Sequence, residues 1–460
     1  MKLSLLFLAI IIVLTGCNNV NEYAKAKTVS KLDSLFNQLE QDGLFNGDML
    51  LSANGDVIFH KSFGYKDFES KTSFAQNSLF EIASITKPFT ALAIAKLVSD
   101  SKIGYSDLVK TYIPELPYES ITIEQLINHT SGLPDYAQVL YPNWDYNKIA
   151  DNNDLMQIMI EKNPKLLSRP GKEWKYSNIG YVMLSIIIER VSGKSYPEYV
   201  QEEIFNPLGM VNSIIPDYNE ALKLDSYVDD YVYNFGNDKY LDPKNFPSFD
   251  NGTFTANMYG ASGICTNAID LLKFTDIFKS QTIVSDSIFK SYLKPQNIKT
   301  PMSDDFTKGW FYSRDSILGP SYFFVGGFAG YRSLVQYFSK SQTTIVILSN
   351  IYTTPVWDIK RMVNEILANK GIKYPKKSFV RKISKSMRQN NYDIKAFEED
   401  FSCDTSQYKL REYELNELLD DYKSAKKDSL NLIVLKKILE CYPNDASIIN
   451  RLEELTNIQQ

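Results

Sequence analysis

The central segment of this sequence reads Phe80-Glu81-Ile82-Ala83-Ser84-Ile85-Thr86-Lys87-Pro88-Phe89-Thr90 and opens an apolar stretch that runs to about Val98. The pattern predicts a helix start at which Ser84 and Lys87, three positions apart, share one face, so that the amine can reach the hydroxyl. A serine hydroxyl becomes a good nucleophile only beside a base. A lysine acts as that base when burial keeps its amine neutral. We therefore predict Ser84 as nucleophile and Lys87 as its base.

The Ser-x-x-Lys spacing carries little information without its surroundings, because it recurs elsewhere in the chain. Only Ser84 stands in an apolar, tightly packed context, whereas the other pairs are interpreted as surface pairs. These pairs are Ser99 with Lys102, Ser287 with Lys290, Ser291 with Lys294 and Ser424 with Lys427.

A second motif is Trp174-Lys175-Tyr176-Ser177-Asn178, which precedes the apolar helical pattern from Ile179 to Val191. A phenol close to a lysine cation can lose or relay a proton, and an amide can hold that lysine and bind a substrate carbonyl. We predict that Tyr176 moves protons with Lys87 and that Asn178 orients the substrate.

Several linked phrases, in the same order, resemble the β-lactamase family of serine hydrolases, which includes class C β-lactamases, D-alanyl-D-alanine carboxypeptidases and esterases. A set of ordered phrases is far more specific than any one motif. The resemblance covers roughly residues 30 to 370. Its phrases are Phe80 to Thr90, Ile121 to Leu133, Pro170 to Asn178, Pro207 to Met210 and Gly260 to Ile264.

The resemblance implies an α/β (α+β) fold of the β-lactamase/transpeptidase type, with an antiparallel sheet flanked by helices and an all-helical subdomain. Strand patterns near both ends of the domain agree, so we expect one sheet assembled from the two ends with a helical insert between them. Residues 227 to 257 are expected to form a long loop region over a pocket. The strand patterns are Asp48 to Ser52, Val57 to His60, Tyr322 to Val325, Arg332 to Phe338 and Thr343 to Leu348.

The third family motif departs from the pattern. Members of the family place Lys or His, then a small residue and Gly, on the strand that borders the site; here Phe324 stands at the basic position, before Gly326 and Gly327. An oxyanion hole would need only the backbone N–H groups of Ser84 and Gly327. A cation for a substrate carboxylate is lost. Arg332 either substitutes for it in part or is a solvated strand residue.

The N-terminus predicts export. Residues 1–16 have the pattern of a signal peptide, and Leu14-Thr15-Gly16-Cys17 resembles the lipobox of bacterial lipoproteins, so Cys17 is expected to carry a lipid, with residues 17–28 as a tether. The alternative is an ordinary cleaved signal with a chance cysteine. We expect a membrane-anchored protein of the periplasm or cell surface. The other cysteines (Cys265, Cys403 and Cys441) are odd in number and widely spaced, so neither a disulfide nor a metal framework is indicated.

The expected domains are a serine hydrolase domain over residues 29–370 and, over 371–460, a linker with a small helical C-terminal extension, which could bind a protein partner. In the extension, Leu430, Ile433, Val434, Ile438 and Leu439 stand at helical spacing. The segment from Leu435 to Leu455, with Tyr442-Pro443 between two helical stretches, faintly resembles a tetratricopeptide-type helix pair. We prefer the interpretation that it forms an exposed helical face.

Composition excludes other classes of function. The 50 basic and 55 acidic residues give a net charge of -5 without a long basic block, so nucleic acid is not an expected partner. With only two histidines, His60 and His129, neither a metal site nor another cofactor is expected.

We predict a hydrolase that cleaves a small-molecule ester, amide or peptide through an acyl-enzyme on Ser84. Phe324 makes the site apolar, which favours an esterase or peptidase-like activity over an efficient β-lactamase. Two alternatives stay open: a catalytically silent binding protein on the same scaffold, and a β-lactamase or D-alanyl-D-alanine carboxypeptidase.

Overall fold

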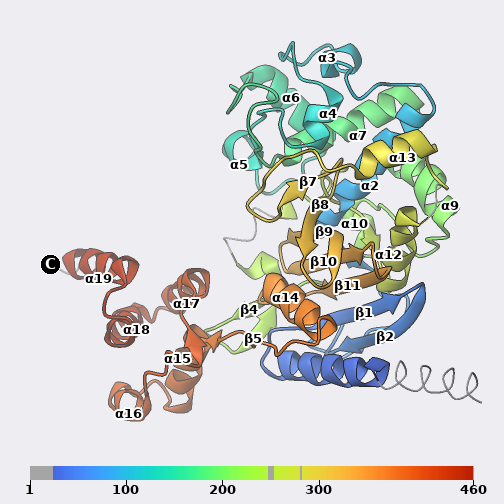
Figure 1. The fold of residues 1–460 in the computed structure, drawn as a ribbon. Coiled ribbons are helices and arrows are strands. Elements are labelled where there is room, and N and C mark those ends of the chain that lie inside the picture. Colours follow the sequence, from blue (N-terminus) through green and yellow to red (C-terminus); the bar gives the residue numbers. More distant parts are fainter. Residues whose placement is uncertain (1–23, 247–252, 280–281, 459–460) are drawn as a thin grey trace, which may run out of the picture. The chain divides into compact units, whose positions relative to one another are not determined.

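The computed structural model describes residues 24–246, 253–279 and 282–458, which divide into two compact units (Figure 1). The first unit comprises the described residues up to Tyr231 and from Asp242 to Ile372. The second comprises Val232–Leu241 and the described residues from Lys373 onward. The division thus differs from the expected domains in one respect: a segment from within the expected hydrolase domain belongs to the second unit.

A seven-stranded antiparallel sheet, as far as the chain is described, forms the centre of the first unit, in the order β2-β1-β11-β10-β9-β8-β7. The N-terminal hairpin joins the C-terminal strands through β1 and β11, where Met49 pairs with Ile347. The expected assembly from both ends of the domain is confirmed. The strands are β1 (Gly47–Ala53), β2 (Asp56–Phe63), β7 (Asp305–Phe306), β8 (Phe311–Asp315), β9 (Gly319–Phe328), β10 (Tyr331–Phe338) and β11 (Thr343–Ser349).

Two inner strands of the sheet, β1 and β11, explain why it is stable. β11 is buried along its whole length, and β1 is buried except at Ala53. The apolar runs at their centres, Met49–Leu51 and Ile345–Leu348, are typical of strands covered on both faces. Helices supply the cover: α12 (Ala268–Phe274) contacts β1 and β11, while α14 (Val356–Leu367) contacts β10.

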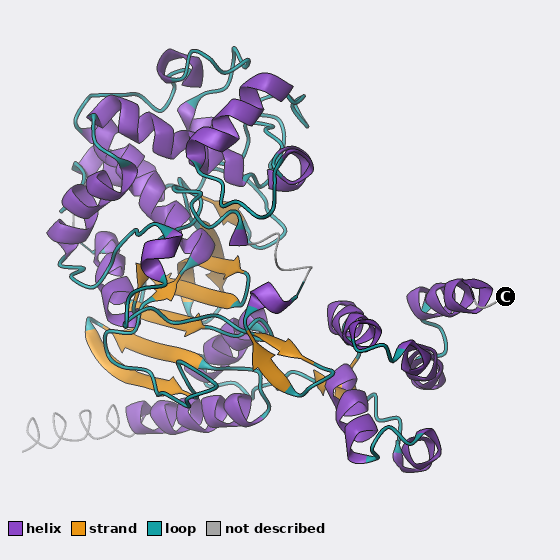
Figure 2. Cartoon of the chain, turned by 180° about the vertical axis from the view of Figure 1, so that it is seen from behind, coloured by secondary structure: helices purple, strands orange, loops and turns teal. Residues whose placement is uncertain are grey.

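A helical subdomain stands above the sheet (Figure 2). Its centre is α7 (Asn178–Ser192), which is buried from Ile179 to Ile188 and packs against α2 (Thr86–Ser99) and α4 (Ile123–Ile127). Gly193 ends α7 in the left-handed conformation that favours glycine. Other helices and short strands of the first unit are α3 (Val109–Tyr112), α5 (Tyr136–Val139), α6 (Asn152–Lys162), α8 (Tyr196–Val200), α9 (Asn206–Leu208), α10 (Tyr218–Ala221), α13 (Asp286–Leu293), β3 (Phe80–Glu81) and β6 (Cys265–Thr266).

The second unit combines a hairpin with five helices among the described residues. The hairpin, β4 (Val232–Asn234) and β5 (Lys239–Leu241), lies within the segment expected to be a loop, so that expectation was wrong there. The carboxylate of Asp421 holds it by accepting the Gly236 N–H at 2.9 Å. The remaining elements are α15 (Phe379–Gln389), α16 (Ile394–Asp400), α17 (Glu412–Ser424), α18 (Asp428–Cys441), α19 (Ala446–Ile458), β12 (Lys377–Ser378) and β13 (Tyr408–Lys409).

The second unit has its own hydrophobic core. Leu430, Val434 and Ile438 of α18 are buried in it, together with Ile383 and Leu418. The prediction of an exposed helical face was therefore wrong, because neighbouring helices cover that face.

A disulfide joins Cys403 and Cys441 within this unit, which corrects the expectation that the cysteines form no disulfide. The two residues are 38 positions apart in sequence, and only the packing of the helices brings them together. Cys265 is buried as a free thiol.

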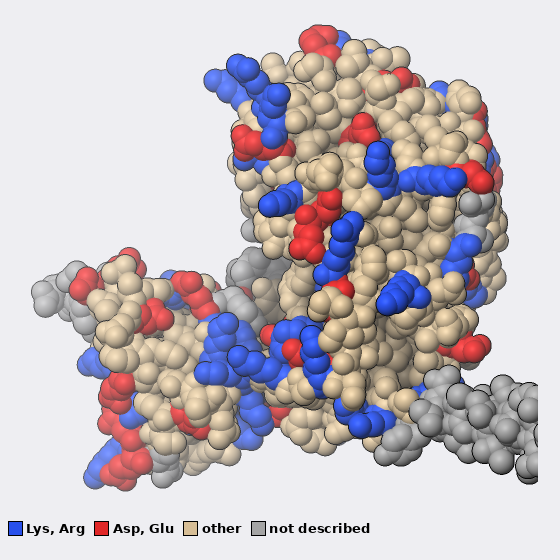
Figure 3. All heavy atoms as spheres, viewed as in Figure 1, with Lys and Arg blue, Asp and Glu red and all other residues tan. Residues whose placement is uncertain are grey.

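On the face of the first unit shown in Figure 3, basic side chains are interspersed with acidic ones. No helix within the described ranges is long and apolar enough to cross a membrane. The predicted signal peptide and Cys17 lie outside the described residues.

The disulfide generates a first prediction. Because it closes a long loop, replacing both Cys403 and Cys441 with Ser should reduce the stability of the second unit by about 2–4 kcal/mol. Scanning calorimetry of the full chain should show one transition moved to lower temperature. Reductant should have the same effect on the wild type and none on the double variant; a wild type that is indifferent to reductant would contradict the prediction.

Candidate active site

Ser84 lies in a short 3-10 turn, η1 (Ala83–Ile85), between β3 and α2. Ala83 has a φ of +51°, a left-handed conformation that is uncommon for a residue with a Cβ atom. The turn presents the Ser84 hydroxyl to two partners. The Oη of Tyr176 donates to Ser84 Oγ at 2.8 Å, and the Nζ of Lys87 lies 3.1 Å from the same oxygen.

The Lys87 side chain is fully buried and has two further partners: the Oδ1 of Asn178 at 2.7 Å and the carbonyl oxygen of Ala261 at 2.9 Å. Burial lowers the pKa of Lys87 to about 7, against the opposing effect of the negative charge on Asp135. A neutral amine has two N–H groups and one lone pair. Since Asn178 and Ala261 offer acceptor oxygens, they take both N–H groups, and the lone pair is left facing Ser84.

Tyr176 remains a phenol at neutral pH, because burial raises its pKa well above the usual range. Of the two roles expected for it, losing a proton or relaying one, the environment favours the relay. A neutral phenol donates to Ser84, Ser84 donates to Lys87, and the three groups form one hydrogen-bonded chain.

His129 supports Tyr176 from behind. Its ring stacks on the Tyr176 ring with centroids 4.4 Å apart, and its Nδ1 accepts the Ser177 N–H at 3.2 Å. Burial lowers the pKa of His129, so the imidazole is neutral.

Asn178 is the first residue of α7 and is held by Asp135, which the sequence interpretation missed. The backbone N–H of Asn178 donates to Asp135 Oδ1 at 2.9 Å, and its side-chain Nδ2 donates to Oδ2 at 3.0 Å. Asp135 follows the quoted phrase ending at Leu133 by two residues, but nothing in its residue type distinguishes it from other exposed or capping aspartates.

The glycines of the third motif lie where β9 contacts the η1 turn. A Cβ atom at Gly326 would overlap the carbonyl oxygen of Ile82, so the close approach of strand and turn requires glycine there. Gly327 is the next residue of the same strand, and an oxyanion hole from the N–H groups of Ser84 and Gly327 stays a prediction.

Phe324 lies on β9 two residues before Gly326, and its side chain is 1% exposed. Its ring packs against Phe311 with centroids 4.9 Å apart. Phe311 contacts Phe306, which in turn contacts His129. The position that is basic in the family is therefore part of an aromatic cluster that extends to Tyr176.

Arg332 pairs with Gly327 across β9 and β10. Its guanidinium donates to the carbonyl oxygens of Ala329 and Tyr331, at 3.0 and 2.6 Å, and lies 4.2 Å from the centre of the Tyr352 ring. The cation is thus next to the third motif but engaged by the turn between the strands.

A family model described as Beta-lactamase matches residues 32–368. The chain belongs to the beta-lactamase family. Penicillin-binding protein 4* of Bacillus subtilis (strain 168) is 34% identical over 322 residues, which cover 69% of this chain and 71% of that protein. Protein flp of Staphylococcus aureus (strain MW2) is 28% identical over 353 residues, covering 74% of this chain and 66% of that protein.

Solved structures share the fold of this beta-lactamase-family chain. The octameric penicillin-binding protein homologue from Pyrococcus abyssi has a TM-score of 0.65 at 24% identity, covering 75% of this chain and 78% of the other. The D-amino acid amidase from Ochrobactrum anthropi SV3 has a TM-score of 0.60 at 19% identity, covering 75% and 96%. The predicted family and fold class are confirmed.

Glu81 contacts the η1 turn that carries Ser84 in this beta-lactamase-family chain, and it was also missed from sequence. Its Oε1 accepts the N–H of Ala83 at 2.9 Å and that of Gly263 at 3.1 Å. One carboxyl group thereby joins the turn that carries Ser84 to the loop that carries Ala261. Burial raises the pKa of Glu81 to about 7.

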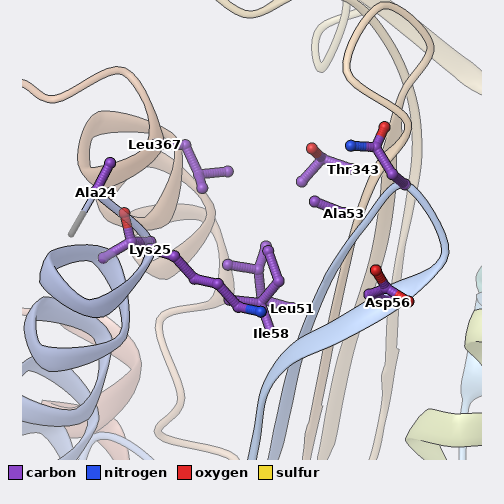
Figure 4. A pocket seen from close by; sticks show the side chains of 10 residues that line it. Ala24, Lys25, Leu51, Ala53, Asp56, Ile58, Thr343 and Leu367 are labelled. Atoms are coloured by element: carbon purple, nitrogen blue, oxygen red, sulfur yellow. The ribbon is translucent and has the colours of Figure 1, made fainter. Parts of the chain in front are cut away.

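Away from Ser84, a cavity of about 390 Å³ lies between the helix described over residues 24–41 and the β1–β2 hairpin (Figure 4). Lys25 and Asp56 are its charged residues, and neither Ser84, Lys87 nor Tyr176 lines it. Within the described ranges, no group of three or more His, Cys, Asp or Glu residues could hold a metal ion.

Glu81 generates a second prediction, on stability. In the fold its carboxyl stays protonated up to about pH 7, whereas in the unfolded chain it ionises near 4.5, so its contribution to stability is complete below pH 4.5 and is lost as the pH rises to 7. Glu81→Gln mimics the protonated acid and keeps the acceptor oxygen. Urea unfolding at pH 5 and pH 8 should show a smaller loss of stability in the variant than in the wild type.

Glu161→Gln, at an exposed position on α6, is the control and should behave as the wild type. Identical pH dependence in the Glu81→Gln variant and the wild type would contradict the assignment.

Proposed function

We propose that the protein is a serine hydrolase that cleaves an ester or amide bond through an acyl-enzyme on Ser84. The observation that carries the proposal is the set of partners around Lys87: two acceptor oxygens, at 2.7 and 2.9 Å, take its N–H groups and leave its lone pair for the Ser84 proton. Core packing alone would not require such an arrangement. Membership of a family composed largely of serine hydrolases agrees with it.

The proposed reaction has two halves. Ser84 Oγ attacks the substrate carbonyl while Lys87 accepts its proton, and the backbone N–H groups of Ser84 and Gly327 stabilise the oxyanion. Tyr176 donates its proton to the leaving group, which departs with it, and takes up the proton held by Lys87, so that both groups return to their neutral forms. A water molecule, activated by the same lysine and tyrosine, then attacks the acyl group and regenerates Ser84.

The proposed substrate is a neutral ester, amide or peptide, because Phe324 replaces a cation with a buried aromatic ring. An apolar wall stabilises an apolar acyl group and offers no partner for a carboxylate. One structural neighbour was solved as a D-amino acid amidase in complex with L-phenylalanine amide, a molecule without a carboxylate. An efficient β-lactamase or carboxypeptidase is the alternative that the names of the penicillin-binding relatives support.

A catalytically silent binding protein is a second candidate. The absence of Lys or His at residue 324 favours it, since the family's third motif is altered there.

We also propose that the chain is exported and anchored to a membrane through a lipid on Cys17, at the periplasmic or outer surface. Residues 1–17 support this proposal through their apolar run and lipobox pattern. The C-terminal unit is proposed as the part that could bind a protein partner.

Hydrolysis tests the proposed function. The wild type should hydrolyse a short-chain p-nitrophenyl ester and react stoichiometrically with a fluorophosphonate probe, while Ser84→Ala should lose labelling and roughly 10³-fold or more of the activity. Ser287→Ala is a matched control, because Ser287 stands three positions before Lys290 on α13 and is exposed. Folded wild type that does not react with the probe would favour the binding protein.

Phe324 provides a fourth prediction. Phe324→His keeps an aromatic ring against Phe311 and adds an N–H donor, so the ratio of benzylpenicillin acylation to ester hydrolysis should rise on the order of tenfold. The matched control is Phe323→His, at the preceding residue of β9, whose ring contacts Trp357 of α14 in addition to Phe311. An equal effect of both variants would contradict the role of residue 324 in selecting neutral substrates.

A further inference from the structure

Asp135 makes an unusual pair of contacts with one residue. Its two carboxylate oxygens accept the backbone N–H and the side-chain Nδ2 of Asn178, at 2.9 and 3.0 Å. The aspartate is partly buried and is the N-cap residue of α5. Neither the capping of α5 nor core packing requires the Asp135 carboxylate to accept from the backbone N–H and also from the side-chain Nδ2 of Asn178, the residue that contacts Lys87.

The contact determines which way the Asn178 amide faces. An amide has an acceptor at one end and a donor at the other, with nearly the same shape. A carboxylate accepts only, so Nδ2 must face Asp135, and Oδ1 must face Lys87 at 2.7 Å. In the reversed orientation, Nδ2 would donate to the Lys87 lone pair and compete with the Ser84 hydroxyl.

Asp135 also acts on the amine as a negative charge: burial raises the pKa of its carboxyl group, and the N–H groups of Asn178 and the charge of Lys87 oppose that rise and favour the carboxylate. The titratable groups around Lys87 are Asp135, Tyr176, Tyr181 and His129: the two phenol rings lie 5.0 and 5.7 Å from Nζ, and His129 interacts with Lys87 electrostatically. Burial raises the pKa of both phenols and lowers the pKa of His129, so these three groups are neutral at pH 7. Asp135 then counteracts the effect of burial on Lys87.

We propose that Asp135 is a positioning residue of the site, which turns the carbonyl oxygen of Asn178 towards Lys87 and supplies the negative charge that faces the Lys87 amine. The inference rests on the proposed serine hydrolase function. Asp135 itself touches none of the reacting atoms; it acts through Asn178 and Lys87.

The test is the pH dependence of fluorophosphonate labelling, measured on the full chain. In the wild type the labelling rate should rise with pH through about 7, as Lys87 loses its proton. Asp135→Asn removes the charge and frees the Asn178 amide to reverse. The plateau rate should fall about tenfold, and the midpoint should move down by roughly one pH unit, because an uncompensated buried lysine loses its proton more readily.

Two further variants separate charge from geometry. Asp135→Ser also removes the charge but retains a good N-cap residue for α5, so it should show the same shift if Asp135→Asn folds poorly. Asp135→Glu keeps the charge on a longer side chain, and should lower the rate while leaving the midpoint near 7.

Asp270→Asn is the matched control. Asp270 is fully buried and accepts the Asn212 N–H at 2.8 Å and the Ser213 hydroxyl at 3.0 Å, on a different helix. This variant should be less stable without any shift in the midpoint. A labelled Asp135→Asn or Asp135→Ser protein with an unmoved midpoint would overturn the inference alone, and a folded wild type without labelling would overturn the proposed function and the inference together.

Discussion

The burial of the Lys87 amine is the constraint around which the site is built. A cationic ammonium is costly to bury, so the fold favours the neutral amine. A buried amine still needs acceptors for its N–H groups, and they come from segments far apart in sequence: Asn178 at the start of α7 and Ala261 in a loop before β6. Each contact that satisfies the lysine also orients its remaining lone pair. The requirement to bury Lys87 without unsatisfied N–H groups would therefore also prepare Ser84 for attack in the proposed reaction.

The η1 turn that carries Ser84 is held in place from two sides. Ala83 is held in a left-handed conformation, and the Glu81 carboxyl accepts its N–H while binding the loop of Gly263. On the other side, β9 approaches so closely that residue 326 must be glycine. Sheet, turn and loop are thus joined at one point, and a shift in any of them would move Ser84 relative to Lys87. Such rigidity keeps the donor and acceptor groups of the site in fixed positions, which the proposed series of proton transfers requires.

In the proposed serine hydrolase, Phe324 would change the substrate of the scaffold without changing its chemistry. The ring replaces a cation but fills the space with aromatic contacts that reach Tyr176 through Phe311, Phe306 and His129. Arg332 lies near the motif, yet its guanidinium is engaged by Tyr352 and the turn carbonyls. This side of the site lacks the positive charge that a carboxylate-binding site would have there. The groups proposed to transfer the proton are retained.

Local patterns singled out Ser84, Lys87, Tyr176 and Asn178, which the fold brings into hydrogen-bonding contact, because residue type, spacing and apolar context are written in short stretches of sequence. Their roles in a reaction stay predictions. The sheet formed from both ends of the domain followed from strand patterns in the same way. The roles of Asp135, Glu81 and the Ala261 carbonyl were not predictable, nor were the Cys403–Cys441 disulfide and the β4–β5 hairpin. These features depend on which distant segments pack together: a carboxylate is a surface residue or a positioning group according to the N–H groups the fold places beside it, and a backbone carbonyl leaves no mark in the sequence at all.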